Sequence, residues 1–221
     1  MRWTCLLLCA VATTASAQTV TSHRVWVGAN VQARPAEDSP WRLSFDSTVR
    51  SRDGVDAVEA WHLRPAVAYD LSTRSSAWLG YAFFRNTPAS GGVLHEHRTW
   101  QQYLWTRPAG DGAVSMRSRL EQRQLAGNDR VSWRWRQQVR LSLPLGSPRV
   151  ALVIWDEFAF HLNGTLRTAR GFDQNRAFAG VNVAVGPPAR VEVGYQNQFV
   201  HASGGSRRLN HILTTTLALI F

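Results

Sequence analysis

The sequence predicts an all-β chain folded as an antiparallel transmembrane β-barrel of about 12 strands, with about 10 as the alternative. Eleven stretches alternate apolar and polar residues with a period of two, as strands do when their two faces meet different surroundings. After residue 17, no segment is apolar for long enough to form a membrane helix. In a membrane barrel, the apolar face contacts lipid and the polar face lines a wet lumen.

The clearest alternation lies in Val131–Leu143. Its apolar face is interrupted only by Gln137, and its polar face is rich in arginine. The other runs, in chain order, are Arg24–Ala33, Trp41–Ser51, Ala57–Tyr69, Ala77–Arg85, Glu96–Trp105, Ala113–Leu125, Val150–Phe160, Asn175–Val185, Arg190–His201 and Arg208–Phe221. Gly, Pro, Asn and Asp cluster between the runs, which is typical of turns. Because bacterial barrels have even strand numbers, we predict one strand beyond these eleven runs.

The first 17 residues have the pattern of a secretory signal peptide. Arg2 is followed by an apolar run, and Ala15-Ser16-Ala17 supplies the small residues expected before a cleavage site. We predict cleavage after Ala17, which leaves residues 18–221 as a single barrel domain. Cys5 and Cys9 are then lost, so the mature chain has no thiol for a disulfide or a zinc site. No cofactor is indicated.

The chain is strongly basic, with a formal net charge of +10, and all of its 25 basic residues are arginine. These arginines alternate with apolar residues along strands and do not gather on one helix or loop, and no nucleic-acid-binding module is recognisable. Nucleic acid is therefore not an expected partner. Lipopolysaccharide, or a small anionic solute, fits the charge better.

Charged residues on the polar faces of neighbouring strands predict a ladder across the lumen, because cross-strand neighbours lie close together. The ladder consists of Glu96, Arg98, Arg117, Arg119, Glu121, Arg123, Arg134, Arg136, Arg140, Arg176, Glu192 and either Asp156 or Glu157. One interpretation is an anion-selective lining. The other is that arginine–carboxylate networks fill a narrow barrel and hold it shut.

The end of the chain resembles the C-terminal assembly signal of outer-membrane proteins, since an apolar strand closes on Phe221. Further motifs resemble the DUF2490 family of bacterial outer-membrane barrels: Glu96-His-Arg98, Arg117-Ser-Arg-Leu-Glu-Gln-Arg123, Trp155-Asp-Glu-Phe158, Gly171-Phe-Asp-Gln-Asn-Arg176 and Val193-Gly-Tyr-Gln-Asn-Gln198. The resemblance implies a barrel in the bacterial outer membrane, inserted by the barrel-assembly machinery. It implies no activity.

Three smaller motifs have both a functional and a structural interpretation. Asp173 and Asn175 are expected in a loop, where they cap a turn or bind sugar or phosphate. His201 and Ser203 form a His-x-Ser pair like that of outer-membrane acyl hydrolases. His95 and His97 share a face, but this spacing alone is not specific for metal, so no metal site is expected.

Tryptophans spread over most of the runs predict an aromatic girdle at the membrane interfaces: Trp26, Trp41, Trp61, Trp78, Trp100, Trp105, Trp133, Trp135 and Trp155. The expected protein is thus a narrow passive channel or a structural membrane component. An outer-leaflet lipid acyl hydrolase is the alternative.

Overall fold

The computed structural model describes residues 19–201 and 206–221, and these form eleven strands. The predicted signal peptide and Ser203 lie outside the described residues. The strands are β1 (Thr19–Ala33), β2 (Trp41–Arg52), β3 (Ala57–Ser72), β4 (Ser75–Asn86), β5 (Leu94–Ala109), β6 (Gly112–Leu125), β7 (Ser132–Ser147), β8 (Val150–His161), β9 (Gly171–Gly186), β10 (Ala189–His201) and β11 (Arg207–Ile220). Within these residues, no helix is both long and apolar enough to cross a membrane.

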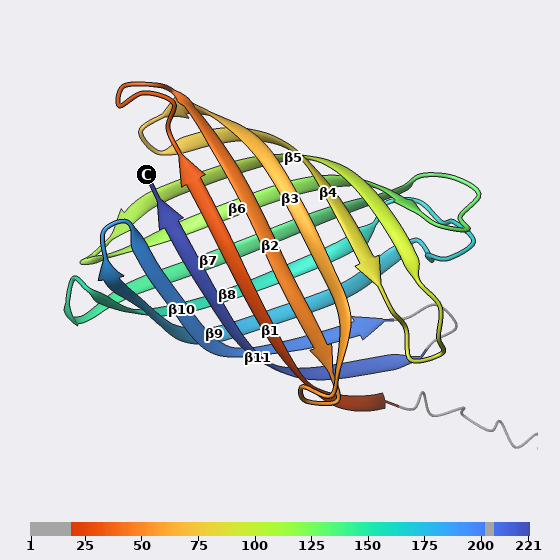
Figure 1. The fold of residues 1–221 in the computed structure, drawn as a ribbon. Helices are drawn as coiled ribbons and strands as arrows, with labels where there is room; N and C mark the ends of the chain where they lie inside the picture. The colour runs from red at the N-terminus through yellow and green to blue at the C-terminus, as the bar shows by residue number, and fades with distance from the viewer. Residues whose placement is uncertain (1–18, 202–205) are drawn as a thin grey trace, which may run out of the picture.

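The strands close into one barrel, in which each strand pairs with the next along the chain (Figure 1). The predicted all-β barrel is therefore confirmed, but the predicted strand counts of 12 and 10 are wrong. Each hairpin reverses the chain, so the first and last of eleven strands run in the same direction. β1 and β11 consequently close the barrel through a parallel register, from Thr19 opposite Arg207 to Gln32 opposite Ile220. The prediction failed because it imposed an even count on eleven correctly recognised runs.

The two ends of the barrel differ in the length of their connections. At one end, which we call the turn end, four of the five connections are two-residue turns, such as Gly110-Asp111 between β5 and β6. The other end, which we call the loop end, carries the connections 87–93, 126–131 and 162–170. The connection between β2 and β3, at the same end, is shorter and contains Asp53 and Gly54. Their φ angles of 51° and 76° suit an Asp-Gly turn.

Apolar side chains cover the outside of the wall, as the alternation predicts. Val27, Leu43 and Val139 are each about half exposed, and the tryptophans Trp133 and Trp135 also point outward. The exterior is thus largely apolar, and the interior holds most of the buried polar groups.

Some tryptophans do not belong to a girdle. Trp26, Trp78 and Trp100 are buried inside the barrel, and Trp155 stacks on the buried Phe178 with ring centroids 5.2 Å apart. Their positions follow from the alternation itself, because each shares the inward face with the polar residues of its strand. Part of the lumen is therefore filled with aromatic rings.

A small apolar core occupies the inner face of β3, β4 and β5. It consists of Ala68, Trp78, Ala82, Phe84 and Trp100. The indole ring of Trp100 lies directly over Gly80, where a Cβ atom would overlap the ring. Glycine at this position is therefore required by packing, because any larger residue would displace the tryptophan.

Candidate functional site: an arginine-lined lumen

The centre of the lumen is crossed by a network of arginines and carboxylates, which we call the central network. Its middle is Glu121, which is 1% exposed. One of its carboxylate oxygens accepts hydrogen bonds from Arg134 Nε at 2.9 Å and Nη2 at 2.6 Å, and the other accepts from Arg136 Nη1 at 2.7 Å. A buried carboxylate with several arginine donors is fully compensated in charge and in hydrogen bonds.

The central network continues through two further carboxylates on neighbouring strands. Glu157 accepts from Arg136 Nη2 at 2.6 Å and pairs with Arg117 on its other side. Glu96 accepts from Arg98 Nε at 2.6 Å and from Arg123 Nε at 2.5 Å. These residues come from β5, β6, β7 and β8, so the network joins four neighbouring strands by side chains as well as by the backbone.

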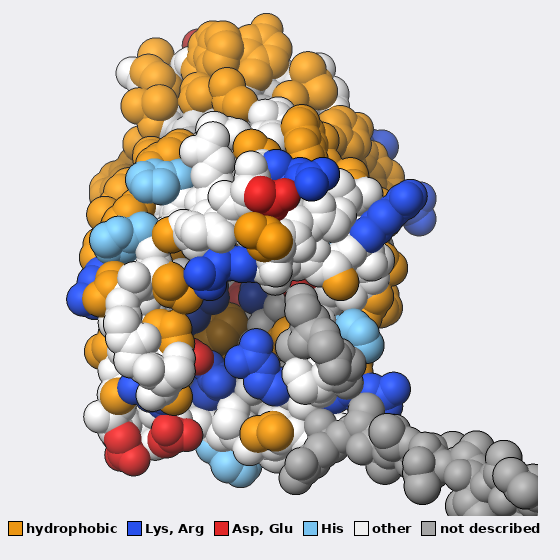
Figure 2. Space-filling model, turned by 90° about the vertical axis from the view of Figure 1, so that its right-hand side faces the viewer, with side chains coloured by type: hydrophobic (Ala, Val, Ile, Leu, Met, Phe, Trp, Pro, Cys, Tyr) orange, Lys and Arg blue, Asp and Glu red, His pale blue; other side chains and the backbone are white. Residues whose placement is uncertain are grey.

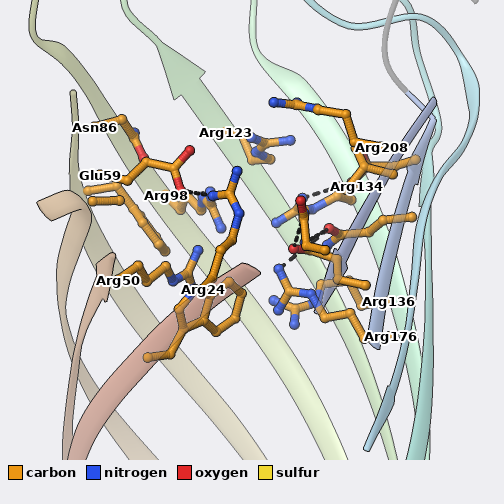
Figure 3. A pocket seen from close by; sticks show the side chains of 18 of the residues that line it. Arg24, Arg50, Glu59, Asn86, Arg98, Arg123, Arg134, Arg136, Arg176 and Arg208 are labelled. Atoms are coloured by element: carbon orange, nitrogen blue, oxygen red, sulfur yellow. Dashed lines mark hydrogen bonds and ion pairs between the residues drawn. The ribbon is translucent and has the colours of Figure 1, made fainter. Parts of the chain in front are cut away.

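Between the central network and the loop end lies a cavity of about 360 Å³, which we call the loop-end chamber. Among the described residues that line it, nine are arginines and two, Glu59 and Asp173, are carboxylates. Figure 3 shows the arginines that it labels reaching into the same space from walls that face each other. Seen from the loop end, the hollow at the middle of the molecule is bordered by basic side chains (Figure 2).

A second cavity of about 450 Å³, the turn-end chamber, lies on the other side of the network. Arg117, Arg119 and Arg140 line it together with Glu192, which pairs with Arg140. Arg64 lines both chambers and donates to Asp46 at 2.9 Å through Nε. Arg64 therefore lies between the two chambers, as the central network does.

The comparisons with known proteins identify the family. A family model described as "Protein of unknown function (DUF2490)" matches residues 23–210. The chain belongs to the DUF2490 family. An uncharacterised protein of Methylorubrum extorquens is 32% identical over 219 residues, which cover 95% of this chain and 93% of that relative. No solved structure matches the chain significantly. The resemblance noted in the sequence is thus confirmed at the level of the family.

The residues of the predicted ladder can now be located in this DUF2490 chain. Those on the wall of the loop-end chamber or in the central network are Glu96, Arg98, Arg123, Glu121, Arg134, Arg136 and Arg176. Those on the wall of the turn-end chamber are Arg119, Arg140, Glu192 and Arg117, which belongs to the central network as well. The alternative left open at Asp156 or Glu157 is decided in favour of Glu157. Asp156 shares the exterior face of β8 with the exposed Ile154 and Phe158.

Several lumen residues were missing from the predicted ladder. Arg24, Arg50 and Arg64 come from β1, β2 and β3 and line the loop-end chamber, where the ring of Trp26 contacts two arginines. The same alternation that revealed the later strands also marks these positions. The predicted ladder begins at Glu96 and therefore does not include them, although β2 alone carries Arg42, Asp46, Arg50 and Arg52.

Asp173 and Asn175 differ from their predicted place. Both belong to β9, which begins at Gly171, and neither caps a turn. Asp173 enters the lumen, where its carboxylate accepts from Arg134 Nη1 at 2.9 Å, whereas Asn175 donates to Asp156 on the exterior at 2.8 Å. Both faces of this strand are polar at its start, so its sequence lacks the alternation that distinguishes a strand from a loop.

Asp173 also belongs to a chain of contacts with His161 and Ser132. His161 Nε2 lies 3.4 Å from Asp173, and its Nδ1 lies 3.2 Å from the Ser132 hydroxyl. This grouping contains the residue types of a hydrolytic triad. However, Ser132 is 0% exposed and its hydroxyl also contacts Thr168 at 3.1 Å, so an acyl substrate has no access to it. These contacts instead attach the loop 162–170 to the inner wall.

The remaining candidate residues lie at the two ends of the barrel. His201 is exposed at the loop end of β10, and the predicted partner Ser203 is outside the described residues. His95 and His97 lie on the exterior of β5, and within the described residues no group of three or more His, Cys, Asp or Glu side chains is placed to hold a metal ion. Phe221 follows β11 at the turn end, where its amide donates to Gln32 at 2.8 Å.

The loop-end mouth is ordered by hydrogen bonds between two of its loops. Asn128 and Asp129 accept from the backbone amides of Arg167 and Leu166. The Arg130 guanidinium, which donates to Asp129 at 2.8 Å, lowers the pKa of that carboxyl below its usual value. Asp129 is therefore ionised at neutral pH, and its hydrogen bonds help to join the loops 126–131 and 162–170 to each other.

Proposed function

We propose that this protein spans the bacterial outer membrane as a narrow passage for small anions. The location is supported by the apolar exterior, by the closure of the barrel without a free strand edge, and by the asymmetry between short turns and longer loops. In this orientation, the turn end and Phe221 face the periplasm and the loop end faces outward. Outer-membrane lipid and lipopolysaccharide then surround the wall.

The observation that carries the proposed selectivity is the arginine excess around the lumen. The loop-end chamber has nine lining arginines against two lining carboxylates, and its entrance is basic as well (Figure 2). A pore wall with one dominant sign of charge concentrates ions of the opposite sign and repels the others. Anions are therefore the solutes that this lumen admits most readily.

The central network favours a second candidate function, that of a closed structural component. Barrels with about 8 strands are filled by side chains, whereas those with 16–18 strands enclose open channels. Eleven strands fall between these classes, and Glu121, Glu157 and their arginines occupy space between the chambers. A passage through this lumen is consequently narrow, and a barrel that conducts no ions is the result expected of the structural role.

Conductance of the refolded mature chain in a planar lipid bilayer, with a salt gradient across it, tests the proposal. We expect small discrete steps and a reversal potential on the anion side. Arg140→Gln removes a half-buried arginine from the turn-end chamber and is expected to shift the reversal potential toward cations. Arg107→Gln is the matched control, because Arg107 is exposed at the turn end and outside both chambers.

A cation-selective current would contradict the proposed passage. A correctly folded barrel without current would favour the structural role. Insertion by the barrel-assembly machinery, which we propose to depend on Phe221, is a separate requirement and does not enter this measurement on refolded protein.

A further inference from the structure

Among the nine arginines that line the loop-end chamber, three form no ion pair with a carboxylate of the described residues: Arg50, Arg176 and Arg208. Arg208 is exposed at the mouth, whereas Arg50 and Arg176 lie deeper in the barrel and are only partly exposed. Arg24 pairs with Glu59, Arg64 with Asp46, and the arginines of the central network with Glu96, Glu121 or Glu157. Among the described residues, no carboxylate forms an ion pair with Arg50 of β2 or Arg176 of β9. A basic group inside a barrel that lacks an internal counter-charge is a candidate for an external one.

Both of these arginines pack against the same aromatic ring. The guanidinium carbon of Arg50 lies 4.2 Å from the ring centroid of Trp26, and that of Arg176 lies 5.4 Å from it. Arg50 also approaches Phe84, with a distance of 5.8 Å. Cation–π contacts hold a guanidinium in place but leave its N–H groups and its full charge available for an anion. Trp26 therefore fixes two positive charges beside the same cavity.

Arg50 and Arg176 have N–H donors that form no hydrogen bond with the described residues. The Nε atoms of Arg50 and Arg176 are both buried, and neither has a hydrogen-bond partner among the described residues. Arg176 makes one contact to Gln174, at 3.4 Å through Nη2. Unsatisfied buried donors are rare in folded proteins, because each one forfeits a hydrogen bond that water would supply. Because these Nε atoms have almost no accessible surface, an acceptor bound in the chamber would meet the terminal Nη groups of the two guanidiniums instead.

We propose that Arg50 and Arg176 form a binding site for a tetrahedral dianion of the phosphate class. A planar carboxylate directs its oxygens within one plane and suits a single facing guanidinium. A tetrahedral oxyanion presents oxygens in all directions, and the arginines of this chamber approach from opposite walls (Figure 3). Two charges on the ligand match the two unpaired arginines that pack on Trp26. The cavity of about 360 Å³ has room for a phosphate or a small phosphate monoester.

The biological use of this site rests on the proposed anion passage, in which it would select phosphate-class solutes at the outer chamber. Its existence can nevertheless be measured without any current. A barrel that binds phosphate but does not conduct would retain the site and refute the passage. A barrel that conducts anions without saturable binding would retain the passage and refute the site.

The test is isothermal titration calorimetry of the refolded chain in detergent micelles with inorganic phosphate. The pH is held at about 8, where phosphate carries two charges, and chloride keeps the ionic strength constant. We expect saturable binding that sulfate displaces and acetate does not. Because a hydrogen bond to a charged group contributes about 1.5–3 kcal/mol, Arg50→Gln and Arg176→Gln should each weaken binding roughly ten- to a hundred-fold.

Two further variants separate the site from general charge and from folding. Arg107→Gln removes the same charge from the exposed turn end and should bind phosphate like the unaltered chain. Arg50→Lys keeps the charge but loses the two-pronged donor geometry, so it should bind with intermediate affinity. If Arg50→Gln does not fold, Arg50→Lys replaces it as the test variant. Folding of each variant is measured by the migration of unheated protein in gels. Equal affinity of folded Arg50→Gln or Arg50→Lys and the unaltered chain, or displacement by acetate as readily as by sulfate, would overturn the proposal.

Discussion

The central network makes Glu121→Gln the most informative single substitution. Gln has nearly the same shape as Glu, so packing is preserved while the negative charge is removed. Glu121 accepts three hydrogen bonds, from Arg134 and Arg136, at 2.6–2.9 Å. In the Gln side chain, an NH₂ group replaces one of the two accepting oxygens. This NH₂ group is itself a donor, so it cannot accept the hydrogen bond of the arginine that it faces.

The expected loss of stability follows from what is left behind in the barrel. Arg134 keeps its contact to Asp173, and Arg136 keeps its contact to Glu157, so neither arginine becomes entirely unpaired. Breaking a buried ion pair by removing one partner typically costs about 3–5 kcal/mol. Because the remaining partners compensate part of this charge, we expect the free energy of unfolding to fall by about 3 kcal/mol, the lower end of that range.

Urea unfolding of the refolded barrel in lipid vesicles, followed by tryptophan fluorescence, measures this change. Glu37→Gln is the matched control, because Glu37 is exposed in the connection 34–40. A surface substitution of this kind should change the free energy of unfolding by no more than about 0.5 kcal/mol. The two variants have the same charge, so a difference between them reports the position of the carboxylate.

A double-mutant cycle with Arg136→Gln checks the physical reason. If Glu121 and Arg136 stabilise each other, the two substitutions together should cost less than the sum of the separate costs, by about 1 kcal/mol or more. A loss of less than about 1 kcal/mol for Glu121→Gln, or strict additivity in the cycle, would show that the network is not a determinant of stability.

Three other expectations follow from the fold. Gly80→Ala should lower the free energy of unfolding by about 1–3 kcal/mol in the same urea assay, because its Cβ overlaps the Trp100 ring, and an unchanged midpoint would contradict this packing. Glu192→Gln should move the reversal potential further toward anions in planar bilayers, since it leaves Arg140 without its carboxylate; a shift toward cations would count against the lumen assignment. Removal of Phe221 should reduce the folded barrel recovered from outer membranes but spare refolding in detergent, and equal recovery would exclude an assembly role.

Much of the architecture was accessible from the sequence because a barrel wall imposes a local rule. Successive side chains of a strand point to opposite faces, so the inward set Ser132, Arg134, Arg136 and Arg140 could be separated from Trp133 and Trp135 without any knowledge of neighbours. The same rule located all eleven runs, and the turn residues between them indicated where the chain reverses. Motifs within these runs also indicated membership in the DUF2490 family.

The closure of the eleven strands through a parallel pair, the register and the pairing of charges depended on tertiary structure. Whether β1 meets β11 in a parallel register is decided when the barrel closes, and no local pattern encodes that contact. Likewise, alternation places Glu121 and Arg50 on the same inner face, but only the register gives Glu121 its arginines and leaves Arg50 beside Trp26 without a carboxylate. The sequence alone therefore determined which side chains face the lumen, and the closed barrel decided which of them meet, because cross-barrel neighbours lie far apart along the chain.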